Sequence, residues 1–121
     1  MAKILIVDDS EAYLHSLAKL VEAEGHEVIT ASSGEQGVEE AKAGRPDVIL
    51  MDIVMPGMSG FQATRKISKD DATKNIPIIF VTTKDQETDR IWGMRQGAIA
   101  YITKPVDKKE LVNAINKALL S

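Results

Sequence analysis

The sequence predicts an α/β fold, a doubly wound five-stranded parallel sheet with helices on both faces. Five short apolar segments alternate with segments whose apolar residues recur at helical spacing, which is typical of repeated strand–helix units. Three apolar segments are continuous rather than alternating, as expected for strands covered by helices on both sides. The predicted strands are residues 3–8, 27–31, 47–51, 76–82 and 98–103.

The apolar character of each segment predicts its place in the sheet. Segments 3–8, 47–51 and 76–82 are continuous apolar runs, so we place them at the centre. Segment 27–31 is shorter and more polar and predicts one edge, and segment 98–103 predicts the other. With right-handed crossovers between parallel strands, the expected order is 2-1-3-4-5, as in flavodoxin-like folds.

Capping residues and glycines mark the expected helix boundaries. A Ser or Asp followed three residues later by Gln or Glu has the spacing of a capping box, which occurs at Ser33–Gln36, Ser59–Gln62 and Asp107–Glu110. Glycines stand where three helices are expected to end, at Gly25, Gly44 and Gly97. Trp92 falls in the fourth helix, where we favour a buried anchor over a partner-contacting residue. The strand–helix pattern fills the chain, so we expect one domain over residues 1–121.

Composition restricts the class of protein. The chain has 121 residues, of which 44% are hydrophobic, enough for one core. A net charge of −3 without a long basic run argues against nucleic acid as a partner. No stretch approaches the roughly 20 apolar residues of a membrane span. Because cysteine and a signal-peptide pattern are both absent, we expect a cytoplasmic protein that does not insert into membranes.

Polar side chains follow the predicted strands at the ends where open α/β sheets bind ligands. Asp8 and Asp9 follow the first strand, and Asp52 follows the third. Thr82 ends the fourth strand, and Lys104 follows the fifth. Because the strands are expected to be parallel, these five residues should gather at one edge of the sheet.

Three carboxylates at one edge repel one another. Two unit charges about 5 Å apart cost roughly 3 kcal/mol at an effective dielectric near 20, so either one acid binds a proton or a cation lies among them. Oxygen ligands in an open site suit Mg²⁺. A carboxylate such as Asp52, with Thr82 and Lys104 beside it, is able to accept a phosphoryl group. Taken alone, Asp8 and Asp9 are equally consistent with capping the first helix.

Four motifs resemble the response-regulator receiver domain of two-component and chemotaxis signalling. They are VDDS (7–10), MDIVMPGMSG (51–60), VTT (81–83) and YITKP (101–105), in that order, each closing a predicted strand. The resemblance covers the whole chain and is greatest to the single-domain regulators of type IV pilus twitching motility.

The resemblance implies the chemistry of the acidic residues. Asp52 accepts a phosphoryl group from the histidine kinase of a chemotaxis-like system, which makes the protein a phosphorylation-activated response regulator. The resemblance also implies Mg²⁺ as the cofactor, held by Asp8, Asp9, Asp52 and the backbone carbonyl of Val54. The domain would catalyse only its own phosphoryl transfer and dephosphorylation, so we do not expect an enzyme that acts on other substrates.

The resemblance also implies how phosphorylation is transmitted. Lys104 contacts the phosphoryl group, Thr82 reorients toward it, and Tyr101 changes its packing in response. The face formed by the fourth helix, fifth strand and fifth helix then binds a downstream protein, or the domain drains phosphate from a shared kinase. Thr83 is a departure, because many family members have a smaller residue at this position, and the lifetime of the phosphate stays open.

Two prolines shape the expected loops. Pro56-Gly57 predicts a tight turn after Asp52, with Pro at its second position and Gly at its third. The resemblance alone implies that the bond between Lys104 and Pro105 is cis.

Two other functions fit the same fold. A flavin or nucleotide enzyme needs a loop rich in glycine, serine or threonine after the first strand. This chain instead has Asp8-Asp9-Ser10-Glu11, whose acids repel a phosphate unless a metal intervenes. A phosphorylation-independent adaptor would keep the pocket as a relic, and the intact set of acids, threonine and lysine argues against it.

Overall fold

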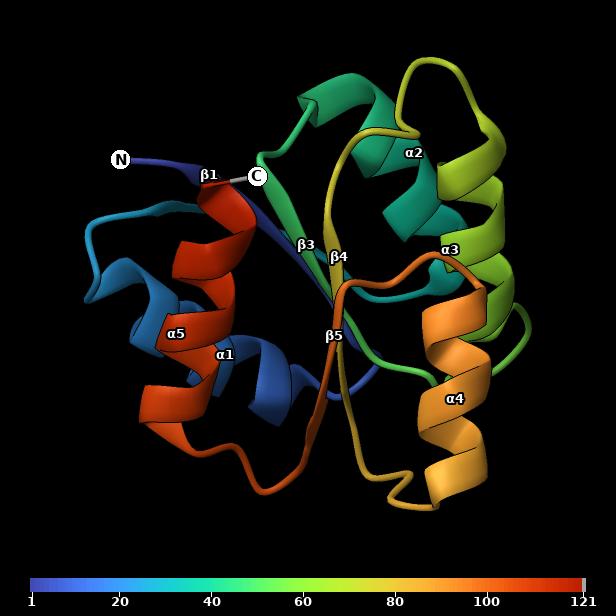
Figure 1. The fold of residues 1–121 in the computed structure, drawn as a ribbon. Helices are drawn as coiled ribbons and strands as arrows, with labels where there is room; N and C mark the ends of the chain where they lie inside the picture. Colours follow the sequence, from blue (N-terminus) through green and yellow to red (C-terminus); the bar gives the residue numbers. More distant parts are fainter. Residues whose placement is uncertain (121) are drawn as a thin grey trace.

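The computed structural model describes residues 1–120, so the last residue of the predicted domain, 121, lies outside it. A single sheet lies between two layers of helices (Figure 1). The strand order β2-β1-β3-β4-β5, with every neighbouring pair parallel, confirms the predicted fold class. The strands are β1 Lys3–Val7, β2 Glu27–Ala31, β3 Val48–Met51, β4 Ile78–Thr82 and β5 Ala100–Thr103.

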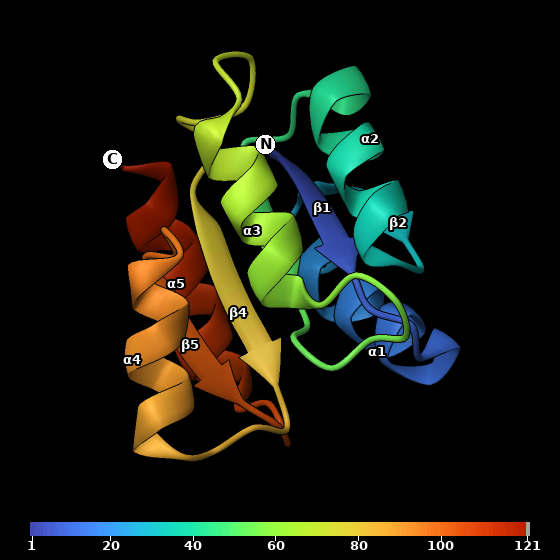
Figure 2. The ribbon, with the colours of Figure 1, turned by 90° about the vertical axis from the view of Figure 1, so that its right-hand side faces the viewer.

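The helices divide between the two faces of the sheet. Helices α1 and α5 cover one face, and helices α2, α3 and α4 cover the other (Figures 1 and 2). Connections that pass alternately over the two faces of a parallel sheet produce this doubly wound arrangement. The helices are α1 Glu11–Glu22, α2 Gly34–Gly44, α3 Gly60–Lys69, α4 Glu87–Arg95 and α5 Lys108–Leu119.

Three strands begin one or two residues later than the apolar segments predict. The clearest case is β4, which begins at Ile78 although the apolar run begins at residue 76. Pro77 has no N–H to donate to a neighbouring strand, while its carbonyl accepts a hydrogen bond from the Ile49 N–H at 3.0 Å. Hydrophobicity therefore located the strand correctly, and backbone pairing fixed its first residue.

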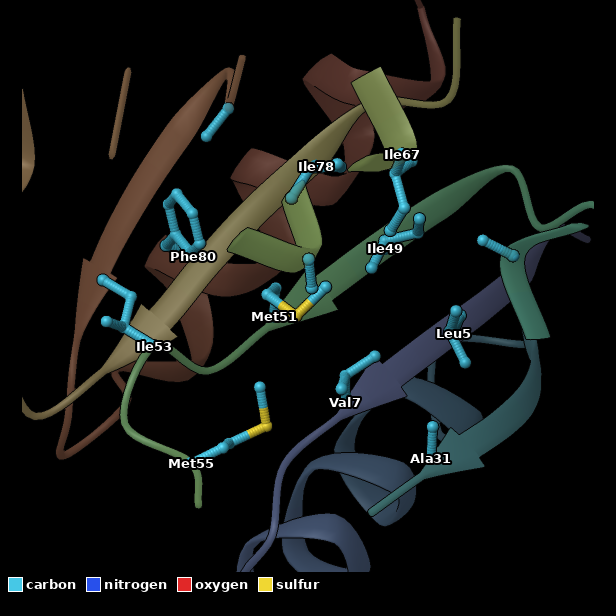
Figure 3. Close-up of a cluster of buried hydrophobic side chains, with 13 residues drawn as sticks. Leu5, Val7, Ala31, Ile49, Met51, Ile53, Met55, Ile67, Ile78 and Phe80 are labelled. Atoms are coloured by element: carbon cyan, nitrogen blue, oxygen red, sulfur yellow. The ribbon is translucent and has the colours of Figure 1, made fainter. Parts of the chain in front are cut away.

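Both faces of the sheet are buried, which explains the continuous apolar runs. On β1, Leu5 and Val7 belong to the core cluster on the side of α2 and α3, and Ile4 and Ile6 belong to the cluster on the side of α1 and α5. Figure 3 shows the first cluster, with Phe80 of β4 among its residues. The central strands are thereby held rigidly, and their carboxyl ends are fixed relative to one another.

The helix boundaries agree only partly with the predicted signals. Ser59 caps α3 with a complete capping box, and Ser33 and Asp107 each accept a hydrogen bond at the start of their helices. Helix α2 ends at Gly44, as predicted. The left-handed position belongs to Arg45, with φ 45°, while Gly44 is the last helical residue.

Helix α4 corrects the expectation for Trp92. The Trp92 side chain is 45% exposed and is not a buried anchor. Gly93 is buried instead, and a Cβ at this position would lie 3.0 Å from the Phe80 ring. The helix therefore contacts the sheet through its backbone at Gly93, and its neighbour Trp92 lies at the surface.

No membrane-spanning element is present among the helices of residues 1–120, because none of them is both long and apolar enough.

Gly60 positions the loop that follows β3. Its N–H donates to the carbonyl of Ile53 at 2.9 Å, which brings the first turn of α3 onto the backbone next to Asp52. A Cβ at Gly60 would overlap the carbonyl oxygen of Asp52. This close approach requires glycine at position 60.

We predict that Gly60→Ala lowers the free energy of unfolding by about 1–3 kcal/mol, the usual cost of overpacking. The clash is with backbone, which cannot turn away as a side chain does. Urea unfolding monitored by circular dichroism measures the loss. Gly44→Ala is the matched control, because its Cβ would meet only the flexible tip of Ile29. Equal stability of Gly60→Ala and the wild type would contradict the assigned role.

Candidate functional site

Backbone pairing brings the carboxyl ends of β1 and β3 together. Val7 pairs with Met51 in the parallel ladder, so Asp8 and Asp52 follow at the same level of the sheet. The Asp52 N–H donates to the Val7 carbonyl at 2.9 Å, and the Asp8 N–H donates to the Ala31 carbonyl at 3.1 Å. The sheet itself therefore places the two acids side by side.

Pairing of β4 with β5 brings the lysine to this edge from the other side. Thr82 of β4 pairs with Thr103 of β5, and the Lys104 N–H donates to the Thr82 carbonyl at 2.7 Å. The backbone of Lys104 therefore lies beside the end of β4, and its side chain starts from there. Residues that are 96 positions apart in the sequence, Asp8 and Lys104, meet at this edge.

The Lys104 ammonium is paired with both acids. Its Nζ lies 2.7 Å from Oδ2 of Asp8 and 3.6 Å from Oδ2 of Asp52. The exposed fractions of the side chains are 4% for Lys104, 2% for Asp8 and 7% for Asp52, so water screens the charges little. Removing Lys104 would be costly, because both buried carboxylates would be left uncompensated. Removing the Asp52 charge would still leave Lys104 paired with Asp8.

Each acid also accepts a hydrogen bond from the backbone. The Ile53 N–H donates to Oδ1 of Asp52 at 2.8 Å, and the Ser10 N–H donates to Oδ1 of Asp8 at 2.9 Å. The pKa of Asp52 is nevertheless raised above its usual value. Burial is the largest cause and Asp8 adds repulsion, while attraction to Lys104 and hydrogen bonding oppose the rise. The surroundings of ionised Asp52 therefore favour the binding of a further cation.

Asp9 completes a group of three acids. One oxygen of each of Asp8, Asp9 and Asp52 lies within 4.8 Å of the others, with Asp9 exposed and the other two buried. Carboxylate oxygens that are open to water on one side fit Mg²⁺, which keeps several waters when it binds. Val54, the predicted backbone ligand, lies two residues beyond Asp52, and its side chain is 52% exposed.

The two predicted switch residues contact the same loop. The Thr82 hydroxyl accepts a hydrogen bond from the Lys84 N–H at 3.3 Å, and the Tyr101 hydroxyl donates to the Lys84 carbonyl at 2.7 Å. Burial is the largest cause that raises the pKa of Tyr101 to about 12, so its hydroxyl keeps its proton at neutral pH. The segment that joins β4 to α4 is thus attached to the site by Thr82 and to β5 by Tyr101.

The predicted loop residues lie beside these groups. Gly57 has φ 74°, the left-handed conformation that a glycine at the third position of a turn allows. Pro56 precedes it and is exposed. The peptide bond between Lys104 and Pro105 is cis.

Sequence reasoning missed Tyr13 of α1. The Lys104 Nζ lies 3.8 Å from the centroid of its ring. A signal was present, because Tyr13 is four residues before Leu17, which faces the core, and residues four apart share a helix face. That spacing places Tyr13 over the sheet but does not say that it contacts a lysine from the far end of the chain.

We predict that Asp52→Asn raises the free energy of unfolding of the metal-free protein at neutral pH. Because the folded protein binds the Asp52 proton more tightly than the unfolded chain does, ionising Asp52 destabilises the folded state. This destabilisation is fully present above the folded-state pKa and disappears as pH falls below 3.8. The difference between variant and wild type should therefore shrink with decreasing pH in chelator-treated urea titrations.

The control for this substitution is Asp71→Asn, at a side chain that is 95% exposed. This control should change the free energy of unfolding by less than about 0.5 kcal/mol. If Asp52→Asn is less stable than the wild type at pH 7, burial and repulsion by Asp8 do not outweigh the attraction of Asp52 to Lys104, and the prediction is wrong.

Comparison with known proteins identifies the family. The chain matches the response regulator receiver domain over residues 4–116. It is 56% identical over 119 residues to the protein PilH of Pseudomonas aeruginosa, across 98% of each chain. Its fold is similar to the chemotaxis protein CheY4 of Vibrio cholerae, with a TM-score of 0.91 and 31% identity, over 98% of this chain and 99% of that one.

A second solved structure is similar over nearly the whole chain. It is the receiver domain of the sensor histidine kinase PA1611 from Pseudomonas aeruginosa PAO1, which has a magnesium ion coordinated in its active-site cleft. The TM-score is 0.91 with 29% identity, over 99% of this chain and 98% of that one. The family match and the identity to PilH together show that the chain belongs to the response regulator receiver domain family.

Proposed function

We propose that this chain is a phosphorylation-activated response regulator, acting as a single domain, whose phosphoryl acceptor is Asp52. One observation carries the proposal: Asp52 is buried at the carboxyl edge of the sheet, with Asp8 and the Lys104 ammonium directly beside it. Receiver domains interact with histidine kinases, and we infer that the donor here is the histidine kinase of a chemotaxis-like system.

Mg²⁺ is the proposed cofactor. Asp8, Asp9 and Asp52 would hold it, together with the backbone carbonyl of Val54. When bound, the ion supplies positive charge to the acids and to the phosphoryl oxygens. Receiver domains generally bind Mg²⁺ at this acidic pocket, and the three carboxylates of this chain provide the hard oxygen ligands that the ion prefers.

The transfer step uses the side chains of the site directly. A carboxylate oxygen of Asp52 attacks phosphorus, and a new O–P bond forms. The N–P bond of the phosphohistidine breaks, and its electron pair stays on the imidazole. The Lys104 ammonium offsets the negative charge of the phosphoryl oxygens, and the Thr82 hydroxyl provides a hydrogen bond to one of them.

Phosphorylation would be transmitted through Thr82 and Tyr101. When the Thr82 hydroxyl turns to the phosphoryl group, it gives up the Lys84 N–H, and the loop that Tyr101 also contacts is free to change. That loop begins α4, so the change reaches the face of α4, β5 and α5. Four large apolar side chains on α4 and the loop after it are 39–47% exposed, namely Ile91, Trp92, Met94 and Ile99. Such a group of exposed apolar residues suits a downstream protein partner.

The similarity to PilH supports a proposal for the biological setting. We propose that the chain acts in the cytoplasm to control type IV pilus twitching motility. Its output is either binding of a target protein by the α4-β5-α5 face or removal of phosphate from a shared kinase.

We predict that incubation with acetyl phosphate and Mg²⁺ adds one phosphoryl group, measured by intact mass spectrometry. Asp52→Asn removes the nucleophile, and chelation of the metal removes the charge that offsets the acids, so neither sample should gain mass. Asp71→Asn, at an exposed acid outside the site, should gain it as the wild type does.

The same variants separate the proposal from its alternatives. A phosphorylation-independent adaptor would show no mass gain and would bind its partner equally well as wild type and as Asp52→Asn. A flavin enzyme on this fold would purify with yellow colour. Mass gain that persists in Asp52→Asn would place the phosphoryl group elsewhere and contradict the proposal.

A further inference from the structure

The Tyr13 ring covers one side of the Lys104 ammonium. The distance from Nζ to the ring centroid is 3.8 Å, within the range of a cation–π interaction. The other partners of the ammonium are Asp8 at 2.7 Å and Asp52 at 3.6 Å. Because the Lys104 side chain is only 4% exposed, the ring replaces water on the side that the acids leave uncovered.

The three partners of Lys104 are not equivalent during the proposed reaction. Asp8 is also a proposed ligand of Mg²⁺, and Asp52 becomes an acyl phosphate when it accepts the phosphoryl group. Metal binding weakens the attraction between Asp8 and the ammonium, and phosphorylation weakens the attraction between Asp52 and the ammonium. Tyr13 takes part in neither event, so its ring is the partner that stays with Lys104 throughout.

We propose that Tyr13 is a positioning residue for phosphoryl transfer to Asp52. Its ring holds the Lys104 ammonium in the pocket while Asp8 is engaged by the metal, so that the positive charge faces the incoming phosphoryl oxygens. The proposal rests on the proposed function and adds to it a residue that acts only through Lys104.

A docking role for Tyr13 is the competing explanation. Tyr13 lines a groove with residues of α1 and of the segment after β5, namely Ala12, Ser16, Leu17, Leu20, Pro105 and Val106. A partner protein in this groove would contact the ring without any need for Lys104. A small phosphodonor has no such surface, so it reports on positioning alone.

The test measures the rate of phosphorylation by acetyl phosphate at saturating Mg²⁺. In this step a carboxylate oxygen of Asp52 forms the new O–P bond, and acetate leaves with the electron pair of the bond that breaks. Tyr13→Leu should lower the maximal rate about tenfold, with little change in the donor concentration at half-maximal rate. Tyr13→Phe retains the ring and should stay within about twofold of the wild type.

A double substitution shows whether Tyr13 acts through Lys104. In the Lys104→Met background, Tyr13→Leu should cause no further loss of rate. Tyr13→Met, which is apolar and flexible but has no ring, repeats the test should Tyr13→Leu fail to fold. If the two losses instead multiply, or if Tyr13→Phe is as slow as Tyr13→Leu, the proposal is overturned.

A second readout needs neither metal nor phosphodonor. The ε-protons of Lys104 should show an upfield NMR shift from the ring in the wild type and in Tyr13→Phe, and lose it in Tyr13→Leu. If the wild type and Tyr13→Phe show this shift and Tyr13→Leu loses it, but the wild type gains no phosphoryl group, the proposed function is wrong. In that case the positioning role of Tyr13 is wrong as well. If the wild type is phosphorylated and Tyr13→Leu is equally fast, only the role of Tyr13 is wrong.

Discussion

The buried contact of one ammonium with two carboxylates is the interaction on which this site depends. Lys104 lies within 4 Å of both Asp8 and Asp52, and all three side chains are at least nine-tenths buried. Removing the Lys104 ammonium from such a group would typically cost about 3–5 kcal/mol, because the two buried carboxylates would be left without compensation. One lysine does not balance three acids, so the site retains a negative charge that a divalent cation would neutralise.

The fold supplies the rigidity that this arrangement needs. The acids come from the ends of β1 and β3, and the lysine follows β5, which pairs with the end of β4. Because both faces of the sheet are packed against helices, these ends cannot move apart to relieve the repulsion. The charge is instead accommodated locally, by the raised pKa of Asp52 and by the Lys104 contact. The segment that can change conformation on phosphorylation is therefore the more exposed one around Lys84, which Thr82 and Tyr101 both contact.

The sheet and the positions of the charged residues were predictable because both follow from local pattern. Continuous apolar runs indicated buried parallel strands, and polar residues at their ends indicated a shared edge. The details that failed depend on contacts between distant segments. Trp92 was expected to be buried, but close approach of Gly93 to Phe80 orients α4 so that Trp92 is exposed. The contact between Tyr13 and Lys104 joins the first helix to the last loop, which no local spacing reveals.

The most direct test of the central claim is the free energy of unfolding measured as a function of Mg²⁺ concentration. An ion that binds only the folded state stabilises it by about 2.7 kcal/mol at 100 times its dissociation constant. The wild type should show this saturable gain, and a protein carrying both Asp8→Asn and Asp52→Asn should not. Equal responses of the two proteins, or no response in either, would contradict the account of this edge of the sheet as a pocket poised for a cation.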